Sequence, residues 1–289
     1  MTPSDASPDG ADDRTSGGRR GPEPDWFSRP RRNADGSAGG GTLNLAYNAL
    51  DRHVVRGRAD DQALLNPFAA PGARSSYSYA DLLELVAQLG GGLRELGVRP
   101  GRSVVLALPL GPELVVGLLA CARVGAVAVP VLDEAPGAVR RLGHPDLDRP
   151  AVVVVDAARK AAVEEVLGAV GRAADYQVVR GPEPGALDAT LGDIDLALVM
   201  RPGSFQPAAC AELPADSPLL VRLPDGGEPA GAGTTTTYDH GWTVDLTAQA
   251  VGAGWGPGSY VGPSDDPGDA SPYGALLGPL LVGATVELR

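Results

Sequence analysis

The sequence predicts an α/β fold, with a mostly parallel, doubly wound sheet and flanking helices on both faces. Two observations support this prediction. Short apolar runs rich in valine and leucine alternate with helical patterns through the middle of the chain, and strands that alternate with helices form βαβ units. Glycine or proline stands at the ends of many of these runs, as expected of residues that form turns.

Residues 1–40 consist mainly of Gly, Ser, Pro, Asp and Arg and contain almost nothing that could be buried. Such a composition cannot offset the conformational entropy lost on ordering. We therefore expect a disordered tail over residues 1–40 and a single domain over residues 41–289.

The first half of this domain carries clear boundary signals. Ser78 suits the N-cap of a helix whose leucines follow helical spacing, and Gly97 ends that helix because glycine readily takes a positive φ. Pro112 suits the first turn of the next helix. The expected helices are 44–55, 78–96, 112–123, 136–142 and 157–170, and the expected strands are 103–108, 126–131, 151–155 and 177–179.

The second half is less regular. Residues 181–218 are rich in Pro, Gly and Asp, and we expect them to form a loose connection. A last strand over residues 284–288 is expected to lie unpaired at the edge of the sheet, where a protein partner could add a strand. The other expected elements are strands 219–223 and 259–261 and helices 234–250 and 273–282.

Composition excludes several functional classes. The formal net charge is −12 and no basic stripe lies outside the N-terminal tail, which argues against nucleic acid as a partner. No apolar run is long enough to span a membrane, and the start of the chain lacks the pattern of a signal peptide. The two cysteines and three histidines do not stand at metal-ligand spacing. We expect a cytoplasmic protein without a metal site of its own.

Several blocks of sequence, in the same order, resemble AMP-forming acyl-CoA synthetases, the acetyl- and propionyl-CoA synthetases in particular. The likeness extends over about residues 26–288 and is strongest in 43–160 and 219–288. The blocks are Leu43-Asn-Leu-Ala-Tyr-Asn-Ala-Leu-Asp-Arg-His53, Tyr77-Ser-Tyr-Ala-Asp-Leu82, Leu93-Arg-Glu-Leu-Gly-Val-Arg-Pro-Gly101, Leu108-Pro-Leu-Gly-Pro-Glu-Leu-Val-Val116, Leu119-Ala-Cys-Ala-Arg-Val-Gly-Ala126 and Tyr273-Gly-Ala-Leu-Leu-Gly-Pro-Leu-Leu-Val-Gly-Ala-Thr285.

The resemblance implies that the loop from Leu223 to Gly233 descends from a nucleotide-binding loop. In the family this loop is rich in Ser, Thr and Gly and contains a lysine, so that amides, hydroxyls and a cation hold the ATP phosphates. Here Asp225 stands where a hydroxyl belongs, Glu228 replaces a threonine and Ala232 replaces the lysine. The expected remnant of the site is Asp225, Gly226, Gly227, Glu228, Gly233 and Thr234.

The resemblance also implies a coenzyme A site. In the family a Phe-Gly-Gly turn and the arginines after the next strand contact the nucleotide end of CoA. This chain has Asp133 and Glu134 at that turn, and Arg159 and Lys160 after the strand 151–155. Arg159 and Lys160 are therefore candidate CoA-phosphate contacts, with two surface cations on a helix as the alternative. Possible ligands are ATP or AMP and coenzyme A, with Mg²⁺ if ATP binds.

The adenine-binding, ribose-binding and acyl-binding motifs of the family, and its lid with a catalytic lysine, are expected to lie beyond residue 289. The first functional hypothesis is thus a truncated, catalytically inactive relative that binds a small ligand or a protein partner. The alternative is one half of a split short-chain acyl-CoA ligase, completed by a second chain. A third hypothesis is a decaying gene product without a selected function. No catalytic residue is assigned.

Overall fold

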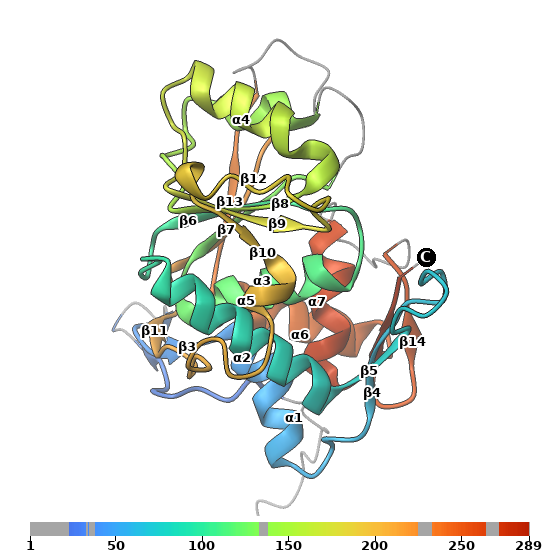
Figure 1. The fold of residues 1–289 in the computed structure, drawn as a ribbon. Coiled ribbons are helices and arrows are strands. Elements are labelled where there is room, and N and C mark those ends of the chain that lie inside the picture. The colour runs from blue at the N-terminus through green and yellow to red at the C-terminus, as the bar shows by residue number, and fades with distance from the viewer. Residues whose placement is uncertain are drawn as a thin grey trace, which may run out of the picture.

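The computed structural model of this protein describes residues 23–32, 34, 38–132, 138–224, 233–263 and 272–288. Its main feature is a seven-stranded sheet with the order β10-β9-β8-β6-β7-β12-β13 (Figure 1). All neighbouring pairs are parallel except the β12–β13 hairpin, which confirms the predicted fold class. The strands are β6 (Ser103–Ala107), β7 (Val127–Pro130), β8 (Val152–Asp156), β9 (Tyr176–Arg180), β10 (Asp193–Asp195), β12 (Pro218–Arg222) and β13 (Thr236–Asp239).

Helices cover both faces of this sheet (Figure 1). Helices α2 (Tyr79–Glu95), α3 (Pro112–Val124) and α5 (Leu196–Val199) pack on one face. Helix α4 (Lys160–Ala169) packs on the other, together with the 3₁₀ turn η2 (Ala138–Gly143). No helix within the described ranges is both long enough and apolar enough to cross a bilayer.

Strand β8 shows why these residues form a central strand. Its four valines are all buried. Val152 and Val154 lie in the core beside α2 and α3, whereas Val153 and Val155 lie in the core beneath α4. A parallel strand with helices on both faces is buried on both sides, so a continuous β-branched run suits it.

Helix α2 begins and ends where the sequence predicts. Ser78 forms a capping box with Asp81, and Gly97 follows the helix with φ of 88°. The middle of the helix carries three glycines, and the chain from Val199 to Ala208 passes directly over them. A Cβ at Gly91 would overlap the carbonyl oxygen of Gln206. Glycine at this position therefore permits a close approach of two backbones.

A second, four-stranded sheet corrects one prediction. Its order is β14-β15-β4-β5, and β15 pairs in parallel with both β14 and β4. The expectation that the last strand is an unpaired edge is therefore wrong, because β4 occupies that position from far earlier in the chain. The edges of this sheet are β14 and β5, and a protein partner at either stays a prediction. The strands are β4 (Gln62–Leu65), β5 (Ser76–Ser78), β14 (Tyr260–Val261) and β15 (Thr285–Glu287).

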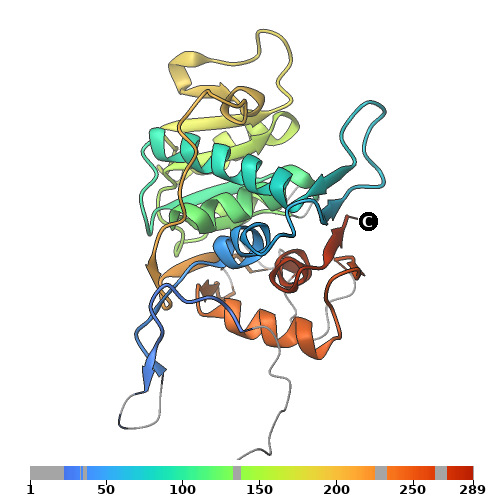
Figure 2. The ribbon, with the colours of Figure 1, turned by 90° about the horizontal axis from the view of Figure 1, so that it is seen from below.

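The beginning and the end of the domain meet at helix α7 (Pro272–Val282). A π-helical turn (Tyr47–Asp51) continues into α1 (Arg52–Val55), and Figure 2 shows this segment beside α7. His53 Nε2 donates to the carbonyl oxygen of Leu280 at 2.8 Å, and Arg58 Nη2 donates to that of Gly283 at 2.8 Å. Arg52 Nη2 donates to the carbonyl oxygen of Leu281. These side chains thus bind carbonyls at the C-terminal end of α7.

Two other predictions differ from the structure. The expected helix 234–250 begins only at Trp242, as α6 (Trp242–Gly252), because Thr236–Asp239 forms strand β13. Threonine is β-branched and suits a strand. The expected loose stretch 181–218 contains regular structure. It includes the 3₁₀ turn η4 (Ala189–Leu191), the edge strand β10, helix α5 and the short strand β11 (Leu213–Pro214).

Part of the expected tail contacts the domain. Arg56 Nη2 forms an ion pair with Asp25 Oδ1 at 2.8 Å, and Asn48 Oδ1 accepts from the amide of Asp25 at 2.7 Å. These contacts order residues around position 25, whereas residues 1–22 lie outside the described part. The remaining short strands are β1 (Arg31–Arg32), β2 (Ala38–Gly39) and β3 (Thr42–Leu43), of which β1 pairs with β2 and β3 with β11.

We predict that Gly91→Ala destabilises the protein by about 1–3 kcal/mol, because the added methyl group must displace the backbone at Gln206. The matched control is Gly168→Ala in α4, where a Cβ would meet nothing within 4 Å. That change should stabilise the protein by about 0.5–1 kcal/mol, since alanine favours a helix more than glycine. Urea unfolding monitored by circular dichroism measures both. Equal effects of the two changes would contradict the close-approach argument.

We also predict that stability falls as the pH drops from about 6.5 towards 4. Burial, with the charges of Arg52 and Arg58, lowers the pKa of His53 to about 4, and burial lowers that of His240 to about 4. The unfolded chain therefore binds protons in this window that the folded chain does not, at a cost on the order of 3 kcal/mol per histidine. Urea unfolding at several pH values measures the slope.

His240→Gln should flatten that slope while lowering stability at neutral pH. The ion pair of Asp81 with Arg74 lowers the pKa of Asp81 to about 2, so its contribution is lost only below its ordinary pKa of 3.8 and lies outside this window. A free energy of unfolding that stays constant from pH 6.5 to 4.5 would contradict the assignment of both histidines.

Candidate functional site

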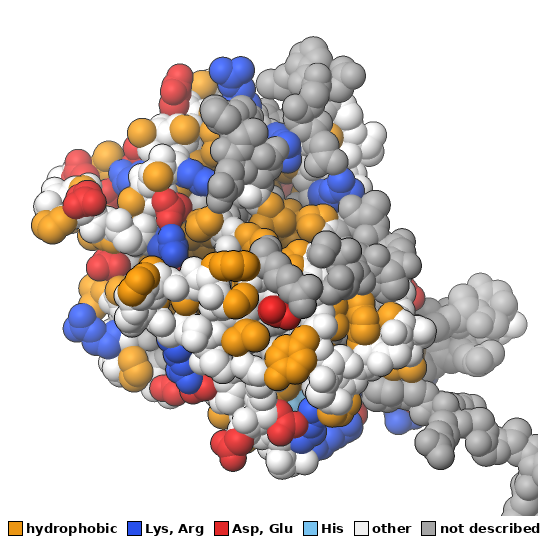
Figure 3. Space-filling model, turned by 90° about the vertical axis from the view of Figure 1, so that its right-hand side faces the viewer, with side chains coloured by type: hydrophobic (Ala, Val, Ile, Leu, Met, Phe, Trp, Pro, Cys, Tyr) orange, Lys and Arg blue, Asp and Glu red, His pale blue; other side chains and the backbone are white. Residues whose placement is uncertain are grey.

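The candidate site lies at the carboxyl ends of the parallel strands. In the sheet, β7 lies on one side of β6 and β8 lies on the other. The chain runs from β6 to β7 in one direction and from β8 to β9 in the opposite direction, so the strand order reverses between β6 and β8. Open α/β sheets bind ligands in the crevice outside the carboxyl ends at such a point. Figure 3 shows the face on the right-hand side of Figure 1, where hydrophobic side chains gather across the middle.

An arginine links three strand ends at this edge. Arg180 ends β9, and its Nη1 lies 2.7 Å from Asp156 Oδ2 at the end of β8. Its Nε lies 3.3 Å from Oε1 of Glu113, in the first turn of the helix that follows β6. Burial alone would lower the pKa of Arg180, but Asp156 and Glu113 outweigh it and raise this pKa. Arg180 was not among the predicted site residues, although a cation directly after a buried strand could have indicated it.

The structure places the two predicted CoA contacts in different surroundings. Arg159 is half-buried, and its Nη1 donates to the carbonyl oxygen of Val131, directly after β7, at 2.9 Å. Lys160 points instead to two acids, with Nζ at 2.7 Å from Glu164 Oε1 and 3.0 Å from Asp193 Oδ2. The two cations are therefore not brought together. Asp133 and Glu134, the residues expected at the CoA turn, lie outside the described residues.

The expected nucleotide loop joins β12 to β13, so it connects two antiparallel strands and not a strand to a helix. Its base is closed tightly, since Gly233 has φ of 92° and a Cβ there would lie 2.7 Å from Pro224 Cβ. The carbonyl oxygen of Gly233 accepts from His144 Nε2 at 3.3 Å. Thr234 is exposed at the same base. Asp225, Gly226, Gly227 and Glu228 lie outside the described residues.

The observed start of α6 also decides where the threonines after Thr234 lie. The hydroxyl groups of Thr236 and Thr237 belong to strand β13 and do not lie at a helix start. Thr235 Oγ1 instead donates to Asp146 Oδ2 at 3.1 Å. The turn at residues 144–146 thus supports the base of the loop from the α4 side of the sheet.

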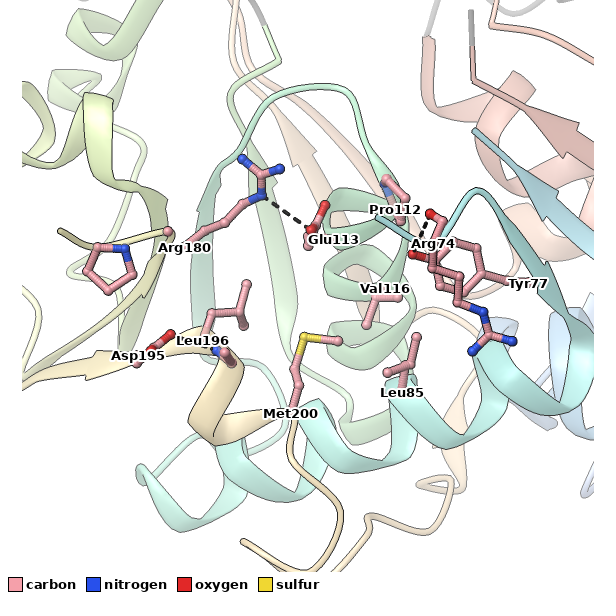
Figure 4. A pocket seen from close by; sticks show the side chains of 13 residues that line it. Arg74, Tyr77, Leu85, Pro112, Glu113, Val116, Arg180, Asp195, Leu196 and Met200 are labelled. Carbon is pink, nitrogen blue, oxygen red and sulfur yellow. Dashed lines mark hydrogen bonds and ion pairs between the residues drawn. The ribbon is translucent and has the colours of Figure 1, made fainter. Parts of the chain in front are cut away.

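A cavity of about 700 Å³ opens beside the Glu113–Arg180 ion pair (Figure 4). Leu85 and Val116 line it from α2 and α3, and Leu196 and Met200 line it from α5 and its end. This cavity was not predicted from the sequence, because its lining comes from segments that are far apart in the chain. No group of three or more His, Cys, Asp or Glu side chains that could hold a metal ion occurs in the described part of the chain.

Comparisons with known proteins agree with this architecture. The family described as AMP-binding enzyme matches residues 50–211. An acetyl-coenzyme A synthetase of Deinococcus radiodurans is 48% identical over 88 residues, which are 30% of this chain and 13% of that protein. A mitochondrial acyl-CoA synthetase short-chain family member 3 of Rattus norvegicus is 39% identical over 87 residues, again 30% of this chain and 13% of that protein.

Solved structures extend the likeness to nearly the whole chain. An acetoacetyl-CoA synthetase from Streptomyces lividans superposes with a TM-score of 0.70 at 25% identity, over 93% of this chain and 42% of that one. An acyl-CoA synthetase of Brucella canis has the same fold, with a TM-score of 0.67 at 21% identity, over 85% of this chain and 43% of that one. The chain thus matches less than half of the length of these relatives.

The family match spans more than half of the 289 residues, and both the relatives and the solved structures are acyl-CoA synthetases. The order of blocks in the sequence and the doubly wound sheet point the same way. This chain belongs to the AMP-binding enzyme family and is acyl-CoA synthetase-like.

Proposed function

We propose that this chain is an acyl-CoA synthetase-like protein that binds a CoA-type or nucleotide ligand without adenylating a substrate on its own. The observation that supports this proposal most is the loop between β12 and β13. Residues 223–233 contain Asp225 and Glu228 and no lysine or arginine. The loop follows the carboxyl end of β12, at the edge where the ligands of such sheets bind.

Electrostatics explains why this loop suits a triphosphate poorly. A carboxylate about 4 Å from one phosphate charge costs about 1 kcal/mol in water and several-fold more when partly buried. Two added acids and one missing cation therefore weaken ATP binding by orders of magnitude. Without bound ATP, no acyl-adenylate can form.

Arg159 is the stronger of the two candidates for a CoA phosphate. Lys160 is neutralised by two carboxylates within 3.0 Å, whereas the partner of Arg159 among the described residues is a neutral carbonyl group. Its guanidinium lies between the ends of β7 and β8, next to the point where the strand order reverses. A planar fork of donors at this position suits a phosphate.

A second candidate function is one half of a split ligase that joins a carboxylate to CoA at the expense of ATP. The observation that favours it is that this chain matches 42% of the length of the acetoacetyl-CoA synthetase chain. A second chain would then have to supply further nucleotide contacts and a catalytic cation. The acidic loop counts against this candidate.

Calorimetric titration of the whole chain with Mg-ATP, AMP and CoA tests the proposal. We expect no Mg-ATP binding in the micromolar range. The triple variant Asp225→Ser, Glu228→Thr, Ala232→Lys should raise the affinity for Mg-ATP at least tenfold, because it removes two negative charges and adds one positive charge. Micromolar Mg-ATP binding by the unaltered chain would refute the proposal and favour the split ligase.

A pair of arginine variants tests the CoA contact. Arg159→Ala should weaken CoA binding at least tenfold, because it removes a charge-assisted contact to phosphate. Arg201→Ala is the control, since Arg201 is exposed and lies in the turn after α5. Dephospho-CoA and adenosine, used as further ligands, show whether the lost energy belongs to a phosphate. Equal CoA affinity of both variants would rule out Arg159 as the contact.

A further inference from the structure

The cavity beside the Glu113–Arg180 ion pair lies at the carboxyl ends of two parallel strands. Arg180 ends β9 and Asp195 ends β10, and both line the cavity together with Glu113 from the first turn of α3. Its volume is about 700 Å³, within the roughly 300–1,000 Å³ that is usual for small-molecule sites. Ligands of open α/β sheets bind outside the carboxyl ends of the strands. Position and volume therefore both indicate a ligand site.

The floor of this cavity is apolar. Leu85 of α2 and Val116 of α3 line it from one side, and Leu196 and Met200 line it from the other. Figure 4 shows these four side chains grouped below the ion pair. Leu85 and Met200 are only half-buried, so an apolar molecule in the cavity can remove part of their surface from water.

Glu113 offers an acceptor that a ligand can reach. Its side chain lines the cavity and is 32% exposed. The partner of its carboxylate among the described residues is Arg180, with 3.3 Å between Glu113 Oε1 and Arg180 Nε. A carboxylate accepts several hydrogen bonds at once. Glu113 can therefore also accept from a donor inside the cavity.

The charges of the lining side chains cancel. Two of these side chains are cations, Arg74 and Arg180, and two are anions, Glu113 and Asp195. Arg180 pairs with Glu113, and the carboxylate of Asp195 accepts from an amide at the start of α5. Arg74 pairs with Asp81. A charged ligand would therefore meet no uncompensated charge of the opposite sign.

We propose that this cavity binds an uncharged aromatic molecule that carries one N–H or O–H donor. The ring lies against Leu85 and Met200, and the donor binds Glu113. An aromatic body suits this lining because the ring of Tyr77 and the thioether of Met200 both line the cavity, and both groups make favourable contacts with aromatic rings. The site is separate from the proposed CoA contact, since Arg159 does not line the cavity.

Other ligand classes fit these residues less well. An anion would lie beside the carboxylates of Glu113 and Asp195. Arg180 would not compensate for them, because it already has a second acidic partner in Asp156. A cation would lie beside Arg74 and Arg180. A ligand without a donor would displace water from Glu113 without replacing the hydrogen bond of that water.

A methionine methyl group reports on the site directly. The chain contains two methionines, Met1 and Met200, and Met200 lines the cavity. The full chain, labelled with ¹³C at the methionine methyl groups, is titrated at pH 7.5 with indole, 1-methylindole, indole-3-acetate and tryptamine. We expect indole to shift the Met200 signal and to bind at least fivefold more tightly than indole-3-acetate or tryptamine. Loss of the donor should make 1-methylindole bind at least threefold more weakly than indole.

Two variants with matched controls locate the site. Ala197 is exposed and lines the cavity, so Ala197→Phe fills part of it and should weaken indole binding at least tenfold. Its control is Ala161→Phe, because Ala161 is exposed on α4, on the opposite face of the sheet. Leu85→Gln makes the floor polar and should weaken binding at least fivefold. Its control is Leu83→Gln, at a half-buried position of the same helix that does not line the cavity.

Several results would overturn the proposal. If indole leaves the Met200 signal unshifted, the cavity does not bind this class of molecule. If tryptamine or indole-3-acetate binds as tightly as indole, the ligand is not selected for lack of charge. If 1-methylindole binds as tightly as indole, the contact with Glu113 is wrong. If Ala197→Phe and Ala161→Phe bind indole equally, indole binds elsewhere. A shift of the Met200 signal on addition of CoA would assign the cavity to the CoA site instead.

Discussion

The C-terminal end of helix α7 is the constraint on which the second half of the structure depends. All residues of this helix from Tyr273 to Val282 are buried, so its last carbonyl groups need partners within the protein. Arg52, His53 and Arg58 bind three of these carbonyls, and Tyr79 donates to that of Ala284 at 2.8 Å. The four side chains belong to segments on either side of β4, and the carbonyl groups lie directly before β15. The contacts therefore hold β15 beside β4. These contacts and the β15–β4 pairing thus join the same two segments of the chain.

Charge compensation governs the edge where a ligand would bind. Arg180 contacts two carboxylates and Lys160 contacts two more, so these cations hold strands and helices together. A phosphate that approached either one would have to compete with acids already in place. Arg159 differs, because its partner within the described part of the chain is the Val131 carbonyl group. Arg180 ends β9 and Arg159 follows β8, yet the two arginines differ in their availability to a phosphate because their partners differ.

The candidate site was predictable only in part. Arg159 follows a valine-rich strand, and the acids of the loop at 223–233 are visible in the sequence. The ion pairs of Lys160 were not, because Asp193 lies in a three-residue strand with a single apolar residue. The cavity beside Glu113 also escaped prediction. It is lined by segments that are far apart in the chain and that only the fold brings together.

The sequence by itself determined the local elements and the fold class. Ser78, Gly97 and Pro112 act within a few residues of themselves, and the valines of β8 are buried on both faces as their pattern predicts. The tertiary structure decided which strands pair. Strand β15 lies inside a sheet because it pairs with β4, which is more than two hundred residues earlier in the chain. Strand β13 forms because it pairs with the free edge of β12. The local propensity of a segment does not determine its pairing partner, since pairing depends on backbone groups that are distant in the sequence.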